Sequence, residues 1–132
     1  MKYIILITMI FLHIVDDFYL QGSLAKYKQK DWWKENYPQD IYRNDYIICL
    51  LIHSFSWSFV MMLPITIGLV FNLNYVDTDY FIYFFVMGFN IVVHSIIDDS
   101  KANWKITSLT KDQVLHLLQI LGTWLSTINL EG

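Results

Sequence analysis

The longest hydrophobic run, residues 46–71, does more than any other feature to limit what this chain can fold into. A bilayer core about 30 Å thick is crossed by roughly 20 predominantly apolar residues in a helix, so this run is long enough to span a membrane. The whole chain is 55% hydrophobic and only 16% charged, which is a balance typical of membrane proteins. We therefore predict an integral membrane protein.

Three further segments can cross a membrane. Residues 3–20 are apolar at first and reach spanning length only when their polar last turns are included. Residues 80–97 have about the shortest comfortable length, and residues 111–129, with Thr110 as the predicted cap, are the least apolar. The predicted fold is all-α: a single membrane domain over residues 1–132, built as a bundle of four transmembrane helices at about 3–20, 46–71, 80–97 and 111–129.

The first of these segments has an alternative interpretation as a cleaved signal peptide. Lys2, the apolar stretch and the small residues at 23–25 imitate the three regions of such a peptide. The stretch between His13 and Ala25 is long and acidic for a cleavage region. We favour a retained helix.

Residues 21–45 interleave lysine and arginine with tryptophan and tyrosine. Amphipathic rings and basic side chains gather at the membrane surface, so we predict an interfacial loop or short helix, over about 23–35, that ends before Pro38. Eight of the nine Lys and Arg residues lie here or between the third and fourth helices. By the positive-inside rule this end faces the cytoplasm. The net charge of −3 and the lack of a basic or phosphate-binding motif argue against a nucleic-acid partner.

The four histidines are predicted to meet at that same end. His13 and His94 lie towards the C-terminal ends of their helices, whereas His53 and His116 lie towards the N-terminal ends. Short connections make successive helices run in opposite directions, which brings these ends to one membrane face. Three of the helices add a carboxylate one turn from the histidine. These carboxylates are Asp17, Asp98 and Asp112.

Imidazole and carboxylate are the usual ligands of zinc, manganese and non-haem iron. We therefore predict one or two divalent transition-metal ions, with zinc or manganese as the first candidates. The predicted ligands are His13, Asp17, His53, His94, Asp98 and His116. A His–Asp pair on membrane helices can also serve only as an interhelical hydrogen bond, and we favour metal binding because all four histidines converge.

Other polar residues receive supporting roles. Asp112 is predicted to be a catalytic residue, as a ligand or by orienting His116, and Lys101 to hold a substrate phosphate or to extend to the membrane surface. Gln21 and Gln113 are predicted to form hydrogen bonds to the ligands without contacting the metal themselves. Helical phase turns Asp16 away from the site, and Asp99 is expected in a solvated loop.

Three ordered motifs, HIVDDFYLQ at 13–21, HSIIDDSK at 94–101 and DQVLH at 112–116, resemble the family of small bacterial and phage membrane proteins known as domain of unknown function 3307. The matching positions are His13, Asp17, Phe18, Leu20, Gln21, His94, Ile97, Asp98, Lys101, Asp112, Gln113 and His116. This chain has Asp16 in place of a common glycine, and Cys49 where relatives often have a second histidine. The resemblance implies no established activity. The pattern is similar to that of membrane-bound metal-dependent hydrolases, and this similarity is an analogy.

The sequence favours hydrolysis of a phosphoester in a lipid or lipid-linked substrate, at the cytoplasmic face of a bacterial inner membrane or a host cell membrane. Membrane lipids are the expected partners, and a homo-oligomer is left open. One alternative is an ion- or proton-conducting protein, which the sparse polar groups expected in the opposite half, Thr66, Asn72 and Asn129, argue against. The other is a phage-type interaction protein, holin-like or an inhibitor, without catalysis.

Overall fold

The computed structural model describes residues 1–129, which fold into helices joined by short loops. A π-helical turn, Asp16–Leu20, continues the first helix, and a 3-10 turn, Asp40–Tyr42, precedes the fourth. The prediction of an all-α fold is confirmed. The six α-helices are α1 (Lys2–Val15), α2 (Leu24–Tyr27), α3 (Lys30–Asn36), α4 (Asp45–Val70), α5 (Tyr80–Ala102) and α6 (Leu109–Thr127).

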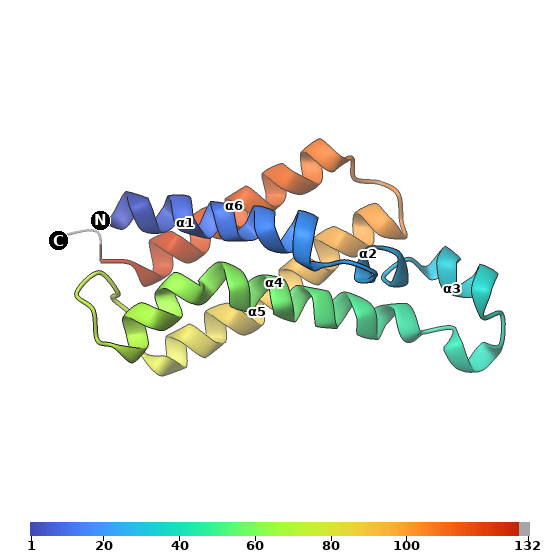
Figure 1. Ribbon diagram of the computed structural model, residues 1–132, viewed down its shortest axis with the longest axis horizontal. Helices are drawn as coiled ribbons and strands as arrows, with labels where there is room; N and C mark the ends of the chain where they lie inside the picture. Colours follow the sequence, from blue (N-terminus) through green and yellow to red (C-terminus); the bar gives the residue numbers. More distant parts are fainter. Residues whose placement is uncertain (130–132) are drawn as a thin grey trace.

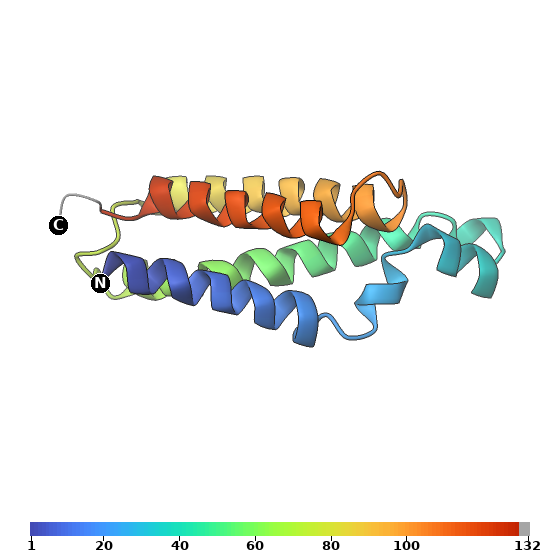
Figure 2. The same ribbon diagram turned by 90° about the horizontal axis from the view of Figure 1, so that it is seen from above.

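The four long helices form a bundle in which successive helices run in opposite directions (Figure 1). α1 contacts α4 and α6, and α5 contacts α4 and α6, so the helices close a ring in chain order. Figure 2 shows two layers, with α1 and α4 in one and α5 and α6 in the other. The short helices α2 and α3 lie at the end away from the N-terminus. This arrangement is the alternating topology that the sequence predicts.

Three segments of the described chain are long and apolar enough to cross a membrane, namely Lys2–Leu20, Asp40–Val70 and Tyr80–Ala102. α6 is not among them, because polar residues lower its hydropathy. Most of its polar residues lie on its buried face, whereas its outward face is mainly apolar. Asp112, His116, Gln119, Thr123 and Thr127 are buried. Val114, Leu117, Leu118, Leu121 and Leu125 face outward.

Several boundaries differ from the sequence prediction. α5 continues past residue 97 to Ala102, so Asp99 lies on a helix and the expectation of a loop residue is wrong. α6 begins at Leu109, and its cap is Ser108, whose hydroxyl accepts a hydrogen bond from the backbone N–H of Lys111, so the predicted Thr110 cap is wrong. The single short helix expected over residues 23–35 is divided into α2 and α3.

The apolar core lies mainly in the half of the bundle away from α2 and α3. Trp57, Met61 and Ile65 of α4 are fully buried and belong to the same cluster as Met9 of α1 and Ile120 of α6. Large side chains that interdigitate between four helices fix their spacing. The core therefore holds the helices rigidly on one side of the polar cluster described below.

The loop between α4 and α5 closes the core end. Gly68 approaches this loop so closely that a Cβ atom there would collide with the side chain of Val76 and lie 2.7 Å from the ring of Tyr75. Val76 forms an isolated antiparallel bridge with Ile128, just after α6. A side chain larger than hydrogen at position 68 would push this loop away from the bundle.

The surface segment with α2 and α3 is fastened to the α5–α6 connection. The side chain of Asn103 donates to the carbonyl of Lys28 (3.1 Å) and accepts from the backbone N–H of Lys30 (2.6 Å). Lys105 Nζ lies 2.8 Å from Asp31 Oδ2. This hydrogen bond and the charge of Lys105 lower the pKa of the Asp31 carboxyl and raise the pKa of Lys105. These contacts hold the backbone at Lys28 beside the bundle.

Candidate metal centre

α1 ends in a π-helical turn that brings two neighbouring carboxylates into the bundle. Within this turn, Gln21 N donates to Asp16 O at 3.0 Å, and the wider helical repeat rotates the chain relative to an α-helix. Asp16 and Asp17 are consequently both buried, with 0% and 5% of their surfaces exposed. The expectation that Asp16 faces away from the interior is wrong, because it assumed a regular α-helical phase.

Three fully buried histidines meet at this level of the bundle. The Nε2 atoms of His53 and His94 are 3.2 Å apart. The rings of His94 and His116 stack with centroids 4.2 Å apart. His13 lies beside them, with its ring centroid 5.6 Å from that of His116. The predicted convergence of the four histidines at one end of the bundle is therefore confirmed.

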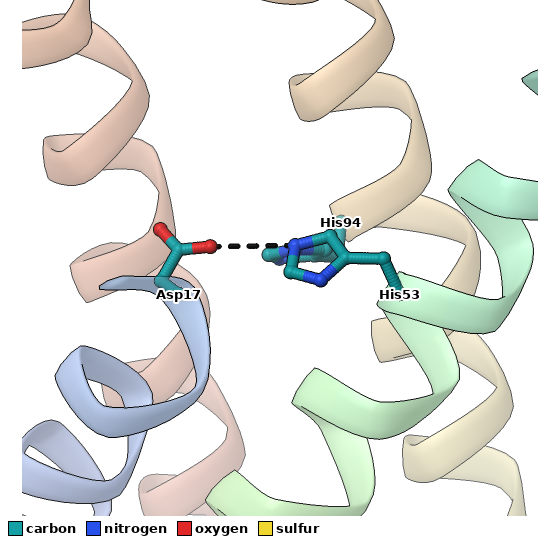
Figure 3. Close-up of side chains that lie close together, drawn as sticks. All are labelled: Asp17, His53 and His94. Atoms are coloured by element: carbon teal, nitrogen blue, oxygen red, sulfur yellow. Dashed lines mark hydrogen bonds and ion pairs between the residues drawn. The ribbon is translucent and has the colours of Figure 1, made fainter. Parts of the chain in front are cut away.

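Carboxylates lie between these rings. Asp98 reaches two histidines, with Oδ2 3.3 Å from His53 Nε2 and Oδ1 3.3 Å from His116 Nε2. Asp17 Oδ1 lies 3.4 Å from His53 Nε2, and Figure 3 shows these two side chains facing each other with His94 close by. Asp112 Oδ1 lies 3.6 Å from His116 Nε2. Helices from both layers of the bundle thus supply donor atoms to one small volume.

This cluster could bind a metal ion. Three overlapping groups of buried side chains each place one donor atom per residue within 4.8 Å of the others. Two ligands at the usual 2.0–2.1 Å from a tetrahedral zinc ion lie roughly 3.3 Å from each other, which matches the distances above. The groups are Asp17, His53 and His94; His94, Asp98 and His116; and Asp17, Asp112 and His116.

Buried polar atoms without a hydrogen bond also support metal binding by the cluster. Buried polar atoms are nearly always hydrogen-bonded, and those that are not require an explanation such as an ion or a water. Here six buried atoms have no hydrogen-bond partner within residues 1–129. They are Asp16 Oδ2, His53 Nδ1, His94 Nδ1, Asp112 Oδ1 and both ring nitrogens of His116.

Histidines that bind a metal are neutral, and under this condition the charges of the cluster do not balance. Four buried carboxylates, those of Asp16, Asp17, Asp98 and Asp112, are accompanied by two lysines. The ammonium group of Lys28 lies 2.5 Å from Asp98 Oδ2, and that of Lys101 lies 2.7 Å from Asp112 Oδ2. With neutral histidines, two negative charges remain uncompensated. One divalent cation would neutralise them, and buried charge is strongly disfavoured without such a partner.

His13 takes part in a chain of hydrogen bonds beside the three groups. The indole N–H of Trp57 donates to His13 Nδ1 at 2.8 Å, so the ring proton of a neutral His13 is on Nε2. That proton points to Gln113 Oε1 at 3.1 Å. Gln113 Nε2 in turn donates to Asp17 Oδ2 (2.9 Å) and Asp112 Oδ2 (3.1 Å). Both ring nitrogens of His13 therefore have hydrogen-bond partners, and His13, a predicted ligand, belongs to none of the three groups. Gln113 donates to two carboxylates.

Gln21 and Lys101 contact residues of the cluster, whereas Cys49 lies outside the three groups. The side chain of Gln21 donates to the carbonyl of Asp17 and accepts from Lys28 Nζ at 3.0 Å, which fits its supporting role. Lys101 lies against Asp112. Cys49 is partly buried and belongs to none of the three groups.

Sequence reasoning missed Lys28, Trp57 and Ser56, whose hydroxyl donates to Asp16 Oδ1 at 2.7 Å. Trp57 follows His53 by one helical turn, and this spacing is a signal that could have identified it. Lys28 has no such signal, because only the fold of the surface segment brings it to Asp98.

No family model, curated protein or solved structure matches this chain. The resemblance to domain of unknown function 3307 stays a prediction.

Proposed function

We propose that this protein is a membrane-embedded, metal-dependent hydrolase that cleaves a phosphoester of a lipid or lipid-linked substrate. The observation that most supports this function is the convergence of three histidines with Asp17 and Asp98 at the spacing of ligands around one ion. A divalent ion bound there would polarise a phosphoryl oxygen and lower the pKa of a water molecule. The charge balance favours one ion.

The chain's own residues have distinct roles in this proposal. His53, His94 and Asp98 would hold the ion, and Asp17 and His116 would complete its surroundings. Asp112 Oδ1 has no hydrogen-bond partner in residues 1–129, which suits a carboxylate that accepts a proton from the attacking water. This is the role proposed for Asp112.

A lysine is proposed to bind the phosphate. Lys28 comes from the surface segment, where a lipid headgroup would enter, and its ammonium group already lies at the cluster. Lys101 is the predicted phosphate ligand, but its contact with Asp112 makes it the partner of that carboxylate. We therefore assign phosphate binding to Lys28 first and the positioning of Asp112 to Lys101.

We also propose that α6 is the fourth membrane span. Its buried face carries most of its polar residues and its outward face is rich in leucine, so lipid would contact mainly apolar side chains. Eight of the nine Lys and Arg residues lie at the end that carries the cluster. By the positive-inside rule, the site then opens to the cytoplasmic leaflet.

Phosphate release from detergent-solubilised lysophosphatidic acid, phosphatidic acid and polyprenyl phosphates tests this function. Wild-type protein loaded with zinc or manganese should release phosphate from at least one of these lipids, and EDTA should stop the reaction until metal is restored. Asp98→Asn should abolish it, whereas Asp45→Asn, the same chemical change outside the three groups, should not. An equally active Asp98→Asn protein would exclude the proposed site.

A second candidate, a proton or ion relay, is favoured by one observation. The half of the bundle opposite α2 and α3 contains a buried polar network that the sequence analysis did not foresee: Asn90 donates to Thr123 at 2.8 Å, and Gln119 donates to Asn90 Oδ1 at 2.9 Å. These groups extend the polar path from the cluster, although all three are neutral. Proton flux through liposomes carrying the protein, lost in Asn90→Leu, would support this alternative over hydrolysis.

A further inference from the structure

A groove of about 270 Å³ opens between α5 and α6, on the lipid-facing side of their layer. Its walls are mainly apolar: Phe85 and Phe89 of α5 and Leu118 of α6 are all exposed. At this depth a membrane helix is surrounded by hydrocarbon chains and not by water. If α6 spans the membrane, an apolar groove at this depth would be filled by a hydrocarbon chain.

The groove begins next to the candidate metal centre. Asn90 in its lining is one helical turn before His94 on α5, and Gln119 is three residues after His116 on α6. One turn of an α-helix rises about 5.4 Å. A molecule that places its phosphoester at His94 and His116 would therefore have the next part of its structure at the start of the groove.

Gln119, in the lining of the groove, has a hydrogen-bond acceptor without a donor. Gln119 is only 9% exposed. Its Nε2 donates to the backbone carbonyl (2.8 Å) and to Oδ1 (2.9 Å) of Asn90, which fixes the orientation of the amide. Its Oε1 is buried and has no partner within the described part of the chain. Such an oxygen is a binding point for a hydroxyl or amide N–H of a ligand.

Gly122 keeps the groove open. A Cβ atom at this position would meet no other atom within 4 Å, so a larger side chain would project into the groove without disturbing the packing of α6. Gly88 on α5 is equally unobstructed but does not line the groove. The two glycines form a matched pair for substitution.

We propose that this groove binds the hydrocarbon chain of a lipid phosphoester whose phosphate lies at the metal centre, and that Gln119 accepts a hydrogen bond from a hydroxyl or amide near the head of that chain. This inference rests on the proposed function and narrows its substrate to long-chain lipids with a donor close to the phosphate. Water-soluble phosphoesters lack the hydrocarbon chain.

Photocrosslinking tests chain binding without requiring turnover. Protein in phosphatidylcholine vesicles is irradiated with lysophosphatidic acid that carries a diazirine in its acyl chain, and the labelled peptides are mapped by mass spectrometry. Wild type and Gly88→Leu should be labelled at α5 and α6 around residues 85–90 and 118–126, and Gly122→Leu should lose most of this label. Uniform labelling of all lipid-facing helices, equal in the three proteins, would overturn the proposal.

The hydrogen bond of Gln119 is tested with a 2-deoxy analogue that lacks the hydroxyl of the probe. A hydrogen bond of ordinary strength gives a preference of roughly fivefold, so unlabelled lysophosphatidic acid should compete with the probe about fivefold better than the analogue. With Gln119→Leu, both lipids should compete equally. If this variant still prefers lysophosphatidic acid about fivefold, Gln119 is not the acceptor of the hydroxyl.

The two proposals fail in different ways. If groove labelling depends on Gly122 but no lipid phosphate is released, hydrolysis is excluded and the chain site stands. If phosphate is released equally well by Gly122→Leu and wild type from the same long-chain lipid, the groove assignment is wrong and hydrolysis stands.

Discussion

Replacing Lys28 by methionine separates the charge balance of the centre from its packing. The ammonium group of Lys28 lies 2.5 Å from Asp98 Oδ2, and only 9% and 1% of the two side chains are exposed. Breaking a buried ion pair by removing one partner costs about 3–5 kcal/mol. Asp98 retains His53 and His116 at 3.3 Å, so we expect the lower end, about 3 kcal/mol, in metal-free protein.

The same substitution should strengthen metal binding. Without Lys28 the cluster carries one more uncompensated negative charge, and a divalent ion no longer approaches a neighbouring ammonium group. Saturating metal adds about 2.7 kcal/mol at 100 times the Kd, so the ion should restore most of the lost stability. Lys28→Met is therefore expected to lower the Tm of metal-free protein by about 10 °C and to lower the Kd for the metal.

The assay is thermal unfolding in detergent with and without zinc, combined with competition against a chelator of known affinity. Lys26→Met is the matched control, because Lys26 is exposed in the same segment and is not in the cluster. Lys26→Met should change neither the Tm of metal-free protein nor the Kd for the metal. A Lys28→Met protein that is equally destabilised with and without metal, or that binds metal more weakly, would refute this charge argument.

Three further substitutions test other parts of the account. Asp16→Asn removes a buried negative charge 3.8 Å from His53 Nδ1 and should weaken metal affinity about 10–100-fold. Competition with a chelator measures this affinity, and an unchanged value would assign Asp16 to packing alone. Gln113→Leu removes the hydrogen-bond donors of Asp17 and Asp112 and should destabilise metal-free protein by about 3 kcal/mol, measured by thermal unfolding. An unchanged stability would contradict the proposed chain of hydrogen bonds. Gly68→Ala should destabilise the protein by about 1–3 kcal/mol through its collision with Val76, and a stabilised variant would show that the loop yields freely.

The position of the cluster could be predicted from sequence because it depends only on helix direction. Four hydrophobic segments with short connections must alternate, and this rule alone brings His13, His53, His94 and His116 to one end. It needs no knowledge of packing. Which atoms face each other depends on helix rotation, which the sequence pattern gives only for regular helices.

Irregular backbone explains the main errors. The π-helical turn adds a residue per turn at the end of α1, and this change in phase turns Asp16 inward. Lys28 reaches Asp98 because Asn103 holds the surface segment, a contact between residues 75 positions apart. Neither feature has a local sequence signature.

The polar character of α6 was visible in the sequence, but its meaning was not. Gln119 and Thr123 dilute the hydropathy of this helix, although both are buried against Asn90. The mean hydropathy of a sequence window cannot distinguish polar residues that face a partner helix from polar residues that face lipid. Only the arrangement of the four helices separates them.

The metal content of purified protein tests the central claim most directly. Inductively coupled plasma mass spectrometry of wild type, His94→Ala and Asp45→Asn, each purified in detergent and incubated with zinc or manganese, gives the number of ions per chain. We predict about one equivalent in wild type and Asp45→Asn and none in folded His94→Ala, since one divalent ion matches the two uncompensated charges. A folded wild-type protein that stays free of metal after zinc, manganese and iron would contradict a metal centre.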